Sequence, residues 1–277
     1  MIIVRIQGGL GNQLFCLNYS RYLKEKTNKK VFIDIRSAFV NDKFLRSSEV
    51  QPFLYEKDNI LFKGIKSKIF WYLIAFLIKF TDKSLRILSI KSKLIVHEDT
   101  KKFSQQPGFY NIGYWQNKKY LKFNYCIASE IIDLFKLGKN RNLKTYKHLQ
   151  IVGLHFRSKD NDHVLGLDYY LTALEKISRL TKKSKLAVYV FTDSLSESQI
   201  HLSPLTQKYE CTFFNQSVIQ DFKDMISCNH LVIARSTYSW WAAFCLSSIN
   251  KKSIICMPLD LGFIDSKNLA LEKWIKI

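Results

Sequence analysis

Residues 151–193 read IVGLHFRSKDNDHVLGLDYYLTALEKISRLTKKSKLAVYVFTD, and this stretch decides the fold. IVGLHF (151–156) and KLAVYVFTD (185–193) are short apolar runs typical of buried strands, and LDYYLTALEKIS (167–178) has the apolar spacing of an amphipathic helix. The alternation continues through CTFF (211–214), VIQDFKDMISC (218–228), HLVIARS (230–236), YSWWAAFCLSSI (238–249) and SIICMP (253–258). It predicts an α/β fold with a parallel sheet covered by helices on both faces.

The N-terminal part opens in a similar way. IIVRI (2–6) reads as a strand ending at a Gly-rich turn, a helix follows Asn12, and VFIDI (31–35) reads as a second strand. The polar, basic segment LGKNRNLKTYKHLQ (137–150) lies between two patterned regions. We therefore predict two domains, residues 1–145 and 146–277.

The net charge is +20, which indicates an anionic partner: nucleic acid, an anionic membrane surface or a phosphorylated small molecule. The lysines are spread over most of the chain, so most of them are interpreted as solvated surface. No aromatic and basic strand motif of an RNA-recognition module is visible. We therefore expect no nucleic-acid partner.

Cysteine usage and the termini indicate a reducing compartment. The six cysteines show no C-x-x-C pair and mostly lie in apolar runs, which predicts buried free thiols and no zinc site. The N-terminus, MIIVRIQGG, lacks the basic and apolar regions of a signal peptide. We expect a cytoplasmic protein, with peripheral contact at the inner face of the membrane as a further hypothesis.

That hypothesis rests on IFWYLIAFLI (69–78), the most apolar run in the chain. Ten residues are too few to span a bilayer as a helix. One interpretation is a buried helix of the N-terminal domain. The other is a helix that contacts anionic lipid through its basic rim, which consists of Lys63, Lys66, Lys68, Lys79 and Lys83.

The Gly-rich turn, GGLGNQLF (8–15), is the first candidate binding element. Its glycines allow a ligand close to the backbone, and the following helix offers unpaired N–H groups to an anion. As a G-x-G-x-x-G dinucleotide fingerprint it fails at the third glycine, where Leu14 stands, although Asp34 occupies the position of a ribose-binding acid. A tight turn without a ligand is the alternative.

Polar side chains follow three predicted strands. His155, Arg157 and Asp160 follow the first, Asp193 the second, and Ser236 with Thr237 the third. Ligands of parallel sheets bind at the carboxyl ends of strands, so these groups are expected to face one crevice. Other interpretations remain open at this point: a core histidine, a capping or turn aspartate, and a Trp240–Trp241 pair that packs a helix and does not stack on a base.

Together these motifs resemble the bacterial α-1,2-fucosyltransferases of glycosyltransferase family 11. The N-terminal GGLGNQLF, then GYWQ (113–116) with Lys119-Tyr120, HFRSKD (155–160), FTDS (191–194) and STYSWW (236–241) follow the family's order. The resemblance runs from residue 2 to about 258, and only residues 40–105 offer no motif. Two departures are Ser158, where the family has a second Arg, and Arg235, where an Asn is frequent; Arg235 is a candidate to compensate for Ser158.

The resemblance implies a GT-B type of fold, with two Rossmann-like domains facing a cleft. The N-terminal domain would carry the acceptor side and the C-terminal domain the GDP-sugar. It implies inverting transfer of L-fucose from GDP-β-L-fucose to a sugar hydroxyl, the 2-hydroxyl of galactose in an oligosaccharide or lipid-linked glycan such as an O-antigen precursor. Two alternatives remain. The chain transfers another sugar from a GDP-deoxysugar, or it is an inactive relative that acts as a binding partner.

Residue roles are also carried over from the resemblance. Arg157 would stabilise the departing diphosphate, and His155 and Asp193 would lie near the guanine and ribose. The general base is left open between Asp160, Asp162 and His155. No metal is expected, since Arg157 can neutralise the diphosphate. The residues expected to bind GDP-fucose are Gly9, Gly11, Asn12, Gln13, His155, Arg157, Asp193, Ser236 and Thr237.

Overall fold

The computed structural model describes residues 1–88, 93–98, 106–137, 150–158, 164–182, 185–262 and 269–277. The chain forms two compact units, Met1–Ile127 and Ala128–Ile277. Helix α3 (Leu121–Leu134) begins in the first unit and ends in the second. The domain boundary predicted at 145/146 lies outside the described residues.

The first unit is built on a parallel sheet of five strands in the order β3-β2-β1-β5-β4. Strand β1 is central, and Ile3 pairs with Tyr110 of β5 on one side and Phe32 of β2 on the other. The elements are β1 (Ile2–Arg5), α1 (Leu10–Lys26), β2 (Val31–Asp34), η1 (Gln51–Phe53), β3 (Asn59–Ile60), α2 (Lys68–Ile87), β4 (Ile95–His97), β5 (Tyr110–Ile112) and η2 (Lys118–Tyr120).

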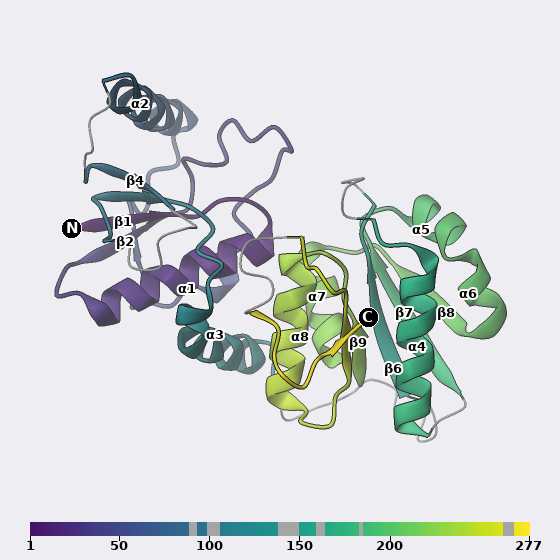
Figure 1. The fold of residues 1–277 in the computed structure, drawn as a ribbon. Coiled ribbons are helices and arrows are strands. Elements are labelled where there is room, and N and C mark those ends of the chain that lie inside the picture. Colours follow the sequence, from purple (N-terminus) through teal and green to yellow (C-terminus); the bar gives the residue numbers. More distant parts are fainter. Residues whose placement is uncertain (89–92, 99–105, 138–149, 159–163, 183–184, 263–268) are drawn as a thin grey trace. The chain divides into compact units, whose positions relative to one another are not determined.

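Helices α1 and α2 cover opposite faces of this sheet (Figure 1). Most of α1 is buried, including Leu14, Phe15 and Leu17. On the other face, Ile3 and Tyr110 form a small apolar cluster against which Ile78 of α2 packs. Trp71 is the buried residue of α2, so the interpretation of residues 69–78 as a buried helix is wrong.

The second unit is built on a parallel sheet of six strands in the order β11-β10-β9-β6-β7-β8. Helices α4, α5 and α6 lie on one face, and α7 and α8 lie on the other (Figure 1). The elements are β6 (Gln150–Phe156), α4 (Leu167–Thr181), β7 (Leu186–Thr192), α5 (Leu195–His201), α6 (Ser203–Lys208), β8 (Glu210–Phe214), α7 (Val218–Ser227), β9 (His230–Val232), α8 (Thr237–Ile249), β10 (Ile255–Met257) and β11 (Ile275–Lys276).

The strand order of the second unit positions its site. The first strand of this sheet along the chain is β6, and β7 and β8 follow it on one side. The chain then crosses back and places β9 against the other edge of β6. The loops that leave β6 and β9 therefore diverge to opposite faces of the sheet. Such a switch point leaves a crevice at the carboxyl ends of the strands, which is where ligands of open α/β sheets bind.

Packing in the second unit explains the tryptophan pair. Trp240 and Trp241 are fully buried in α8, and the Trp240 Nε1–H donates to the carbonyl of Leu269 at 3.2 Å. The rings meet edge to face with centroids 5.4 Å apart. The interpretation of these residues as helix packing is confirmed.

The cysteines and helices agree in part with the sequence-based expectations. All six cysteines are free; four are buried, whereas Cys126 is exposed and Cys211 is half-buried. Among the described residues, none of the helices combines the length and the apolar character needed to cross a bilayer. In the same residues, no group of three His, Cys, Asp or Glu side chains is arranged to hold a metal ion.

Candidate active site

His155 lies near the end of β6, buried between the sheet and α8. Its ring faces Tyr238 at 5.6 Å between centroids. Nδ1 is buried and has no hydrogen-bond partner among the described residues. Burial, reinforced by the nearby Arg157 guanidinium, lowers the pKa of His155 to about 4. The imidazole is therefore neutral near pH 7, and its low basicity makes it poorly suited to be a general base.

Arg157 lies just past β6 and is half-buried. Its position at a strand end suits a guanidinium that binds phosphate oxygens through two parallel hydrogen bonds. Asp160 and Asp162, two of the candidates for general base, lie outside the described residues.

Ser158 and Asp193 join the ends of two neighbouring strands. The Ser158 backbone N–H and its hydroxyl both donate to Oδ1 of Asp193, at 2.9 and 3.0 Å. Because β6 and β7 pair in parallel through Phe156 and Thr192, these loops leave the sheet side by side. Ser158, a departure from the family motif, therefore fixes the orientation of the Asp193 carboxylate.

The N-terminus of α8 supplies the third part of the site. Ser236 is the N-cap, and its hydroxyl accepts from the backbone N–H of Tyr238 at 3.2 Å. Thr237 is half-buried, and its side chain makes no hydrogen bond with the described residues. The N–H groups of the first turn carry partial positive charge, so this end of α8 favours an anion.

Tyr238 holds this helix end in place, a role that the sequence reading missed. Its hydroxyl donates to the carbonyl of Val218, the first residue of α7, at 2.6 Å, while its ring contacts His155 and Phe222. Tyr238 thereby links α7, α8 and β6. The signal was its place inside the STYSWW motif, between the capping Ser236 and the buried tryptophans.

Arg235 has a different environment from Arg157. Its Nε–H donates to the carbonyl of Asp260, beyond the end of β10, at 3.3 Å. That contact holds the segment after β10 against the end of β9. Compensation of Ser158 by Arg235 stays a prediction.

His155, Arg157, Asp193, Ser236 and Thr237 thus lie at the carboxyl ends of three adjacent strands, β7, β6 and β9. Neutral imidazole, guanidinium, oriented carboxylate and helix N-terminus meet at the switch point of the sheet. This set of groups can bind a nucleotide through its base and its phosphates together.

In the first unit, the Gly-rich turn and the GYWQ segment come together. They follow β1 and β5, which are paired, and Gln116 Nε2 donates to Oδ1 of Asn12 at 2.7 Å. Gly8 has φ +77°, and a Cβ there would lie 2.9 Å from Asn12 and 3.1 Å from the Tyr114 ring. Gly8 is therefore required both by its backbone conformation and by the space available.

Glu98 supports the GYWQ segment from β4. Its Oε2 accepts from the backbone N–H groups of Tyr114 and Trp115, at 2.8 and 2.9 Å. Burial raises the pKa of Glu98, and these two N–H groups act in the opposite direction. Glu98 lies in the stretch for which the sequence offered no motif.

Gly9, Gly11 and Asn12 form the start of α1. Gly9 is the N-cap and makes no side-chain cap, and a Cβ on it would meet nothing within 4 Å. Gly11 is buried. The open space at Gly9 lies beside the first N–H groups of α1. That a ligand binds there stays a prediction.

Gln13 does not face that space. Its amide donates to the carbonyls of Gly8 and Ser47, both at 2.9 Å, and accepts from the N–H groups of Glu49 and Val50, at 2.8 and 3.0 Å. All of its hydrogen-bonding capacity is used within the unit. Gln13 is therefore a positioning residue that ties the 47–50 loop to the Gly-rich turn.

Asp34 is likewise structural. Its carboxylate is fully buried, where it accepts from the Tyr110 hydroxyl at 2.6 Å and from the N–H groups of Arg36 and Ser37 at 3.0 and 2.9 Å. An acid so occupied is unsuited to bind a ribose, which removes the argument for a nicotinamide enzyme.

The sequence was compared with protein families and with known proteins. The model of the family described as Glycosyl transferase family 11 matches residues 1–277. An "O-antigen biosynthesis glycosyltransferase WbnK" of Escherichia coli is 23% identical, covering 98% of this chain and 99% of that protein. An "Alpha-1,2-colitosyltransferase" of the same organism is 22% identical over 100% of this chain and 99% of its own length.

Among solved structures, the α-1,6-fucosyltransferase NodZ co-crystallised with GDP aligns with a TM-score of 0.51 at 15% identity, covering 87% of this chain and 90% of that one. The NodZ structure from Bradyrhizobium gives 0.50 at 14% identity, over 87% and 91%. At this identity the likeness concerns the fold alone. The GT-B type, predicted from the sequence, is confirmed.

Proposed function

Because the chain belongs to glycosyl transferase family 11, and is therefore a glycosyltransferase, we propose that it moves L-fucose from GDP-β-L-fucose onto a glycan hydroxyl with inversion. The acceptor group is the 2-hydroxyl of galactose. One observation carries the proposal: the groups suited to a nucleoside diphosphate sugar converge at the switch point of the second sheet.

The donor would bind to the second unit through three contacts. The Asp193 carboxylate, oriented by Ser158, would accept from the N1–H and 2-amino groups of guanine, and His155 lies beside it. A uracil base presents no such pair of donors, so this contact would select GDP over UDP. Arg157 and the N-terminus of α8 at Ser236 and Thr237 would hold the diphosphate.

The chemistry follows from charge. The acceptor oxygen attacks the anomeric carbon on the face opposite the diphosphate, the bond from that carbon to the phosphate oxygen breaks, and its electron pair leaves with GDP. Negative charge grows on the diphosphate during this step, and a preorganised guanidinium stabilises it. The acceptor proton passes to a base; the low pKa of His155 favours Asp160 or Asp162 for that role.

Binding and turnover test the proposal separately. GDP should raise the melting temperature of the protein, whereas UDP, NAD and RNA should not. Incubation with GDP-fucose and a galactoside should yield an α-1,2-linked product, and the matched 2-deoxygalactoside should yield none. Stabilisation by UDP in place of GDP, or GDP binding without turnover on any galactoside, would contradict the proposal.

A second candidate donor is another GDP-deoxysugar. It is favoured by the relative named as a colitosyltransferase and by Ser158, which replaces a guanidinium of the family motif with a hydroxyl. Competition decides: equal amounts of GDP-fucose and GDP-colitose are supplied with one acceptor, and the ratio of products gives the ratio of kcat/KM. A ratio in favour of colitose would reassign the donor.

The acceptor is proposed to be an oligosaccharide or lipid-linked glycan, reached at an anionic membrane surface. The relative named for O-antigen biosynthesis supports a glycan acceptor. Support for membrane contact comes from α2, which exposes Ile69, Phe76 and Phe80. An amphipathic helix with a basic rim binds the interface of a bilayer rather than spanning it. Flotation with anionic and neutral vesicles tests the contact.

A further inference from the structure

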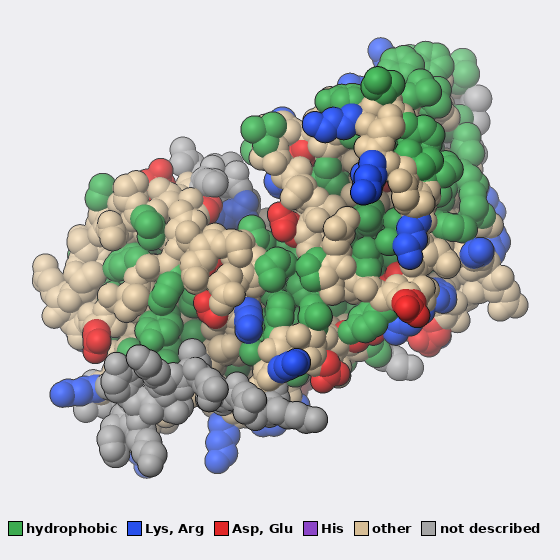
Figure 2. Space-filling model, turned by 180° about the vertical axis from the view of Figure 1, so that it is seen from behind, with side chains coloured by type: hydrophobic (Ala, Val, Ile, Leu, Met, Phe, Trp, Pro, Cys, Tyr) green, Lys and Arg blue, Asp and Glu red, His purple; other side chains and the backbone are tan. Residues whose placement is uncertain are grey.

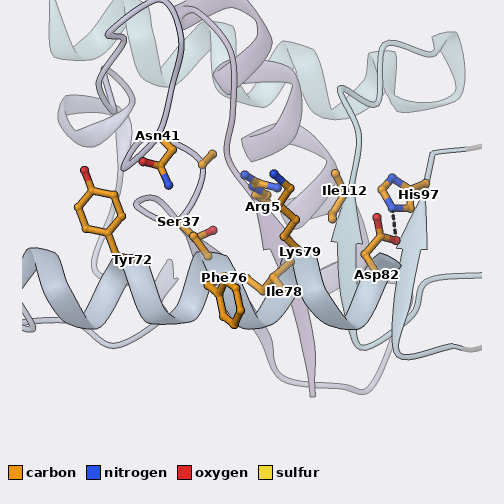
Figure 3. Close-up of a pocket in the computed structure, with 12 residues that line it drawn as sticks. Arg5, Ser37, Asn41, Tyr72, Phe76, Ile78, Lys79, Asp82, His97 and Ile112 are labelled. Carbon is orange, nitrogen blue, oxygen red and sulfur yellow. Dashed lines mark hydrogen bonds and ion pairs between the residues drawn. The ribbon is translucent and has the colours of Figure 1, made fainter. Parts of the chain in front are cut away.

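A pocket of about 610 Å³ lies between α2 and the sheet of the first unit. Arg5 enters it from β1, Ser37 and Asn41 from the segment after β2, and Lys79 from α2 (Figure 3). Phe76 of α2 also lines it. No part of the site described above lines this pocket. The pocket therefore needs its own explanation.

Two cations, Arg5 and Lys79, face this pocket. Arg5 and Lys79 both extend into it (Figure 3), and neither forms an ion pair with a described carboxylate. The Nε of Arg5 is buried and has no hydrogen-bond partner among the described residues. A buried donor of a charged group is costly to leave unsatisfied, so an anionic ligand would complete the pocket.

The carboxylate that lines the pocket, Asp82, already has other partners. His97 Nε2 lies 2.8 Å from one of its oxygens, and an Arg86 guanidinium nitrogen lies 3.1 Å from the other. Asp82 therefore forms its ion pairs with Arg86 and His97 and not with Arg5 or Lys79. Asp34, the neighbour of Arg5 on β2, accepts from the Tyr110 hydroxyl and two backbone N–H groups.

The wall of the pocket continues into an exposed apolar surface. Tyr72 and Phe76 line the pocket, yet 46% and 61% of their surface is exposed. They belong to a stripe along α2, called here the apolar face, which comprises Ile69, Tyr72, Leu73, Phe76, Leu77 and Phe80. The space-filling view shows hydrophobic side chains gathered with basic side chains over this region (Figure 2).

We propose that this pocket binds the phosphate headgroup of a membrane lipid, with the hydrocarbon of that lipid against the apolar face of α2. Arg5 supplies a planar fork that matches two phosphate oxygens, and Lys79 adds a mobile point charge. The apolar face can bind the hydrocarbon part of a lipid, and a soluble phosphate has no such part. The apolar face therefore favours an amphiphile over a soluble phosphate as the ligand. If the proposed function holds, the phosphate of a lipid-linked acceptor is a natural occupant.

Calorimetric titration of the full chain with dihexanoyl phosphatidic acid, below its micelle concentration, tests the site. Dihexanoyl phosphatidylcholine and inorganic phosphate serve as comparison ligands. We expect saturable binding of the phosphatidic acid, and at least about tenfold weaker binding of both comparisons, the scale of one charge-assisted contact.

Variants locate the contact. Arg5→Gln and Lys79→Gln should each weaken the binding of phosphatidic acid about tenfold or more. Lys83→Gln is the matched control, because Lys83 is exposed on the same helix but does not line the pocket. Lys79 is also exposed, so its variant tests the site even if Arg5→Gln fails to fold.

Equal losses in Lys79→Gln and Lys83→Gln would mean that the cationic surface binds lipid non-specifically, and would overturn the proposal. If inorganic phosphate binds with the same affinity as phosphatidic acid, the proposal that a lipid occupies the pocket is overturned. GDP binding is measured on the same samples. The pocket and the donor site are made of different residues, so loss of one binding event with retention of the other shows which of the two proposals fails.

Discussion

Arg157 is the residue on which the proposed chemistry depends most, and it lies just past the end of β6. Because its contact would tighten as charge develops on the leaving group, Arg157→Ala should lower kcat by about 10²–10³-fold. Arg157→Lys should restore part of this, since an ammonium cannot bind two oxygens in a plane. Steady-state kinetics with GDP-fucose is the measurement. A variant that folds normally and turns over at a near-normal rate would show that the diphosphate binds elsewhere.

The role of Ser158 in orienting Asp193 can be tested by substitution. Ser158→Ala removes one of the two hydrogen bonds that orient Asp193 and keeps the backbone one. The loss of about 1 kcal/mol corresponds to roughly fivefold weaker GDP binding. Calorimetry compares it with Ser203→Ala, an exposed serine at the start of α6. Unchanged affinity in Ser158→Ala would remove Asp193 from the guanine contact.

His155 makes the stability of the second unit depend on pH. Burial lowers its pKa to about 4, below the 6.5 of the unfolded chain. Between these values the unfolded chain binds more protons, so the contribution of His155 is full above pH 6.5 and is lost as the pH falls toward 4. At pH 5 the loss is about 2 kcal/mol.

Urea unfolding at pH 7 and pH 5 measures this loss. His155→Gln should lose less stability over the interval than the unchanged protein. His230→Gln should do so as well, because burial also lowers the pKa of His230 to about 4. If His155→Gln shows the full loss of the parent, protonation of His155 is not what destabilises the fold.

In the turn between β1 and α1, the two adjacent glycines differ in backbone conformation and in the space around them. Gly8 has a positive φ and close neighbours, whereas Gly9 has an ordinary φ of −75° and open space around it. Gly8→Ala should therefore cost about 1–3 kcal/mol of unfolding free energy, through backbone strain and contact with Asn12 and Tyr114.

Gly9→Ala is the matched control for stability and should change it by less than about 0.5 kcal/mol. Chemical denaturation of the two variants is the measurement. A methyl at Gly9 would, however, enter the space in front of α1, so a ligand bound there should be weakened without loss of stability. Equal destabilisation by both changes would refute this division of roles.

The order of most elements in the second unit was predictable from the sequence, because strand and helix differ in apolar period. Helix α6 and strand β11 were not predicted. The first unit was less so. Its strands β3, β4 and β5 are two or three residues long, too short to show alternation. Glu98 and Asp34 were also beyond prediction as structural groups, since their partners come from distant segments.

For the whole molecule, we predict transfer without a divalent metal. In the proposed mechanism, Arg157 would carry the charge that a metal otherwise supplies to the diphosphate. Activity in excess chelator should equal activity with added manganese. Loss of most activity in chelator, restored by manganese, would contradict this and would direct attention to Asp160 and Asp162.

In both units the first strand along the chain occupies the middle of its sheet, with β1 between β2 and β5 and β6 between β7 and β9. During synthesis, therefore, each sheet grows outward on one side first and leaves the other edge of its founding strand open. For β1 that edge stays open until Tyr110–Ile112 has left the ribosome. An open, apolar strand edge readily pairs with other chains. Nascent chains stalled before β5 or β9 should accordingly be the species that aggregate or recruit chaperones, whereas full-length chains should not.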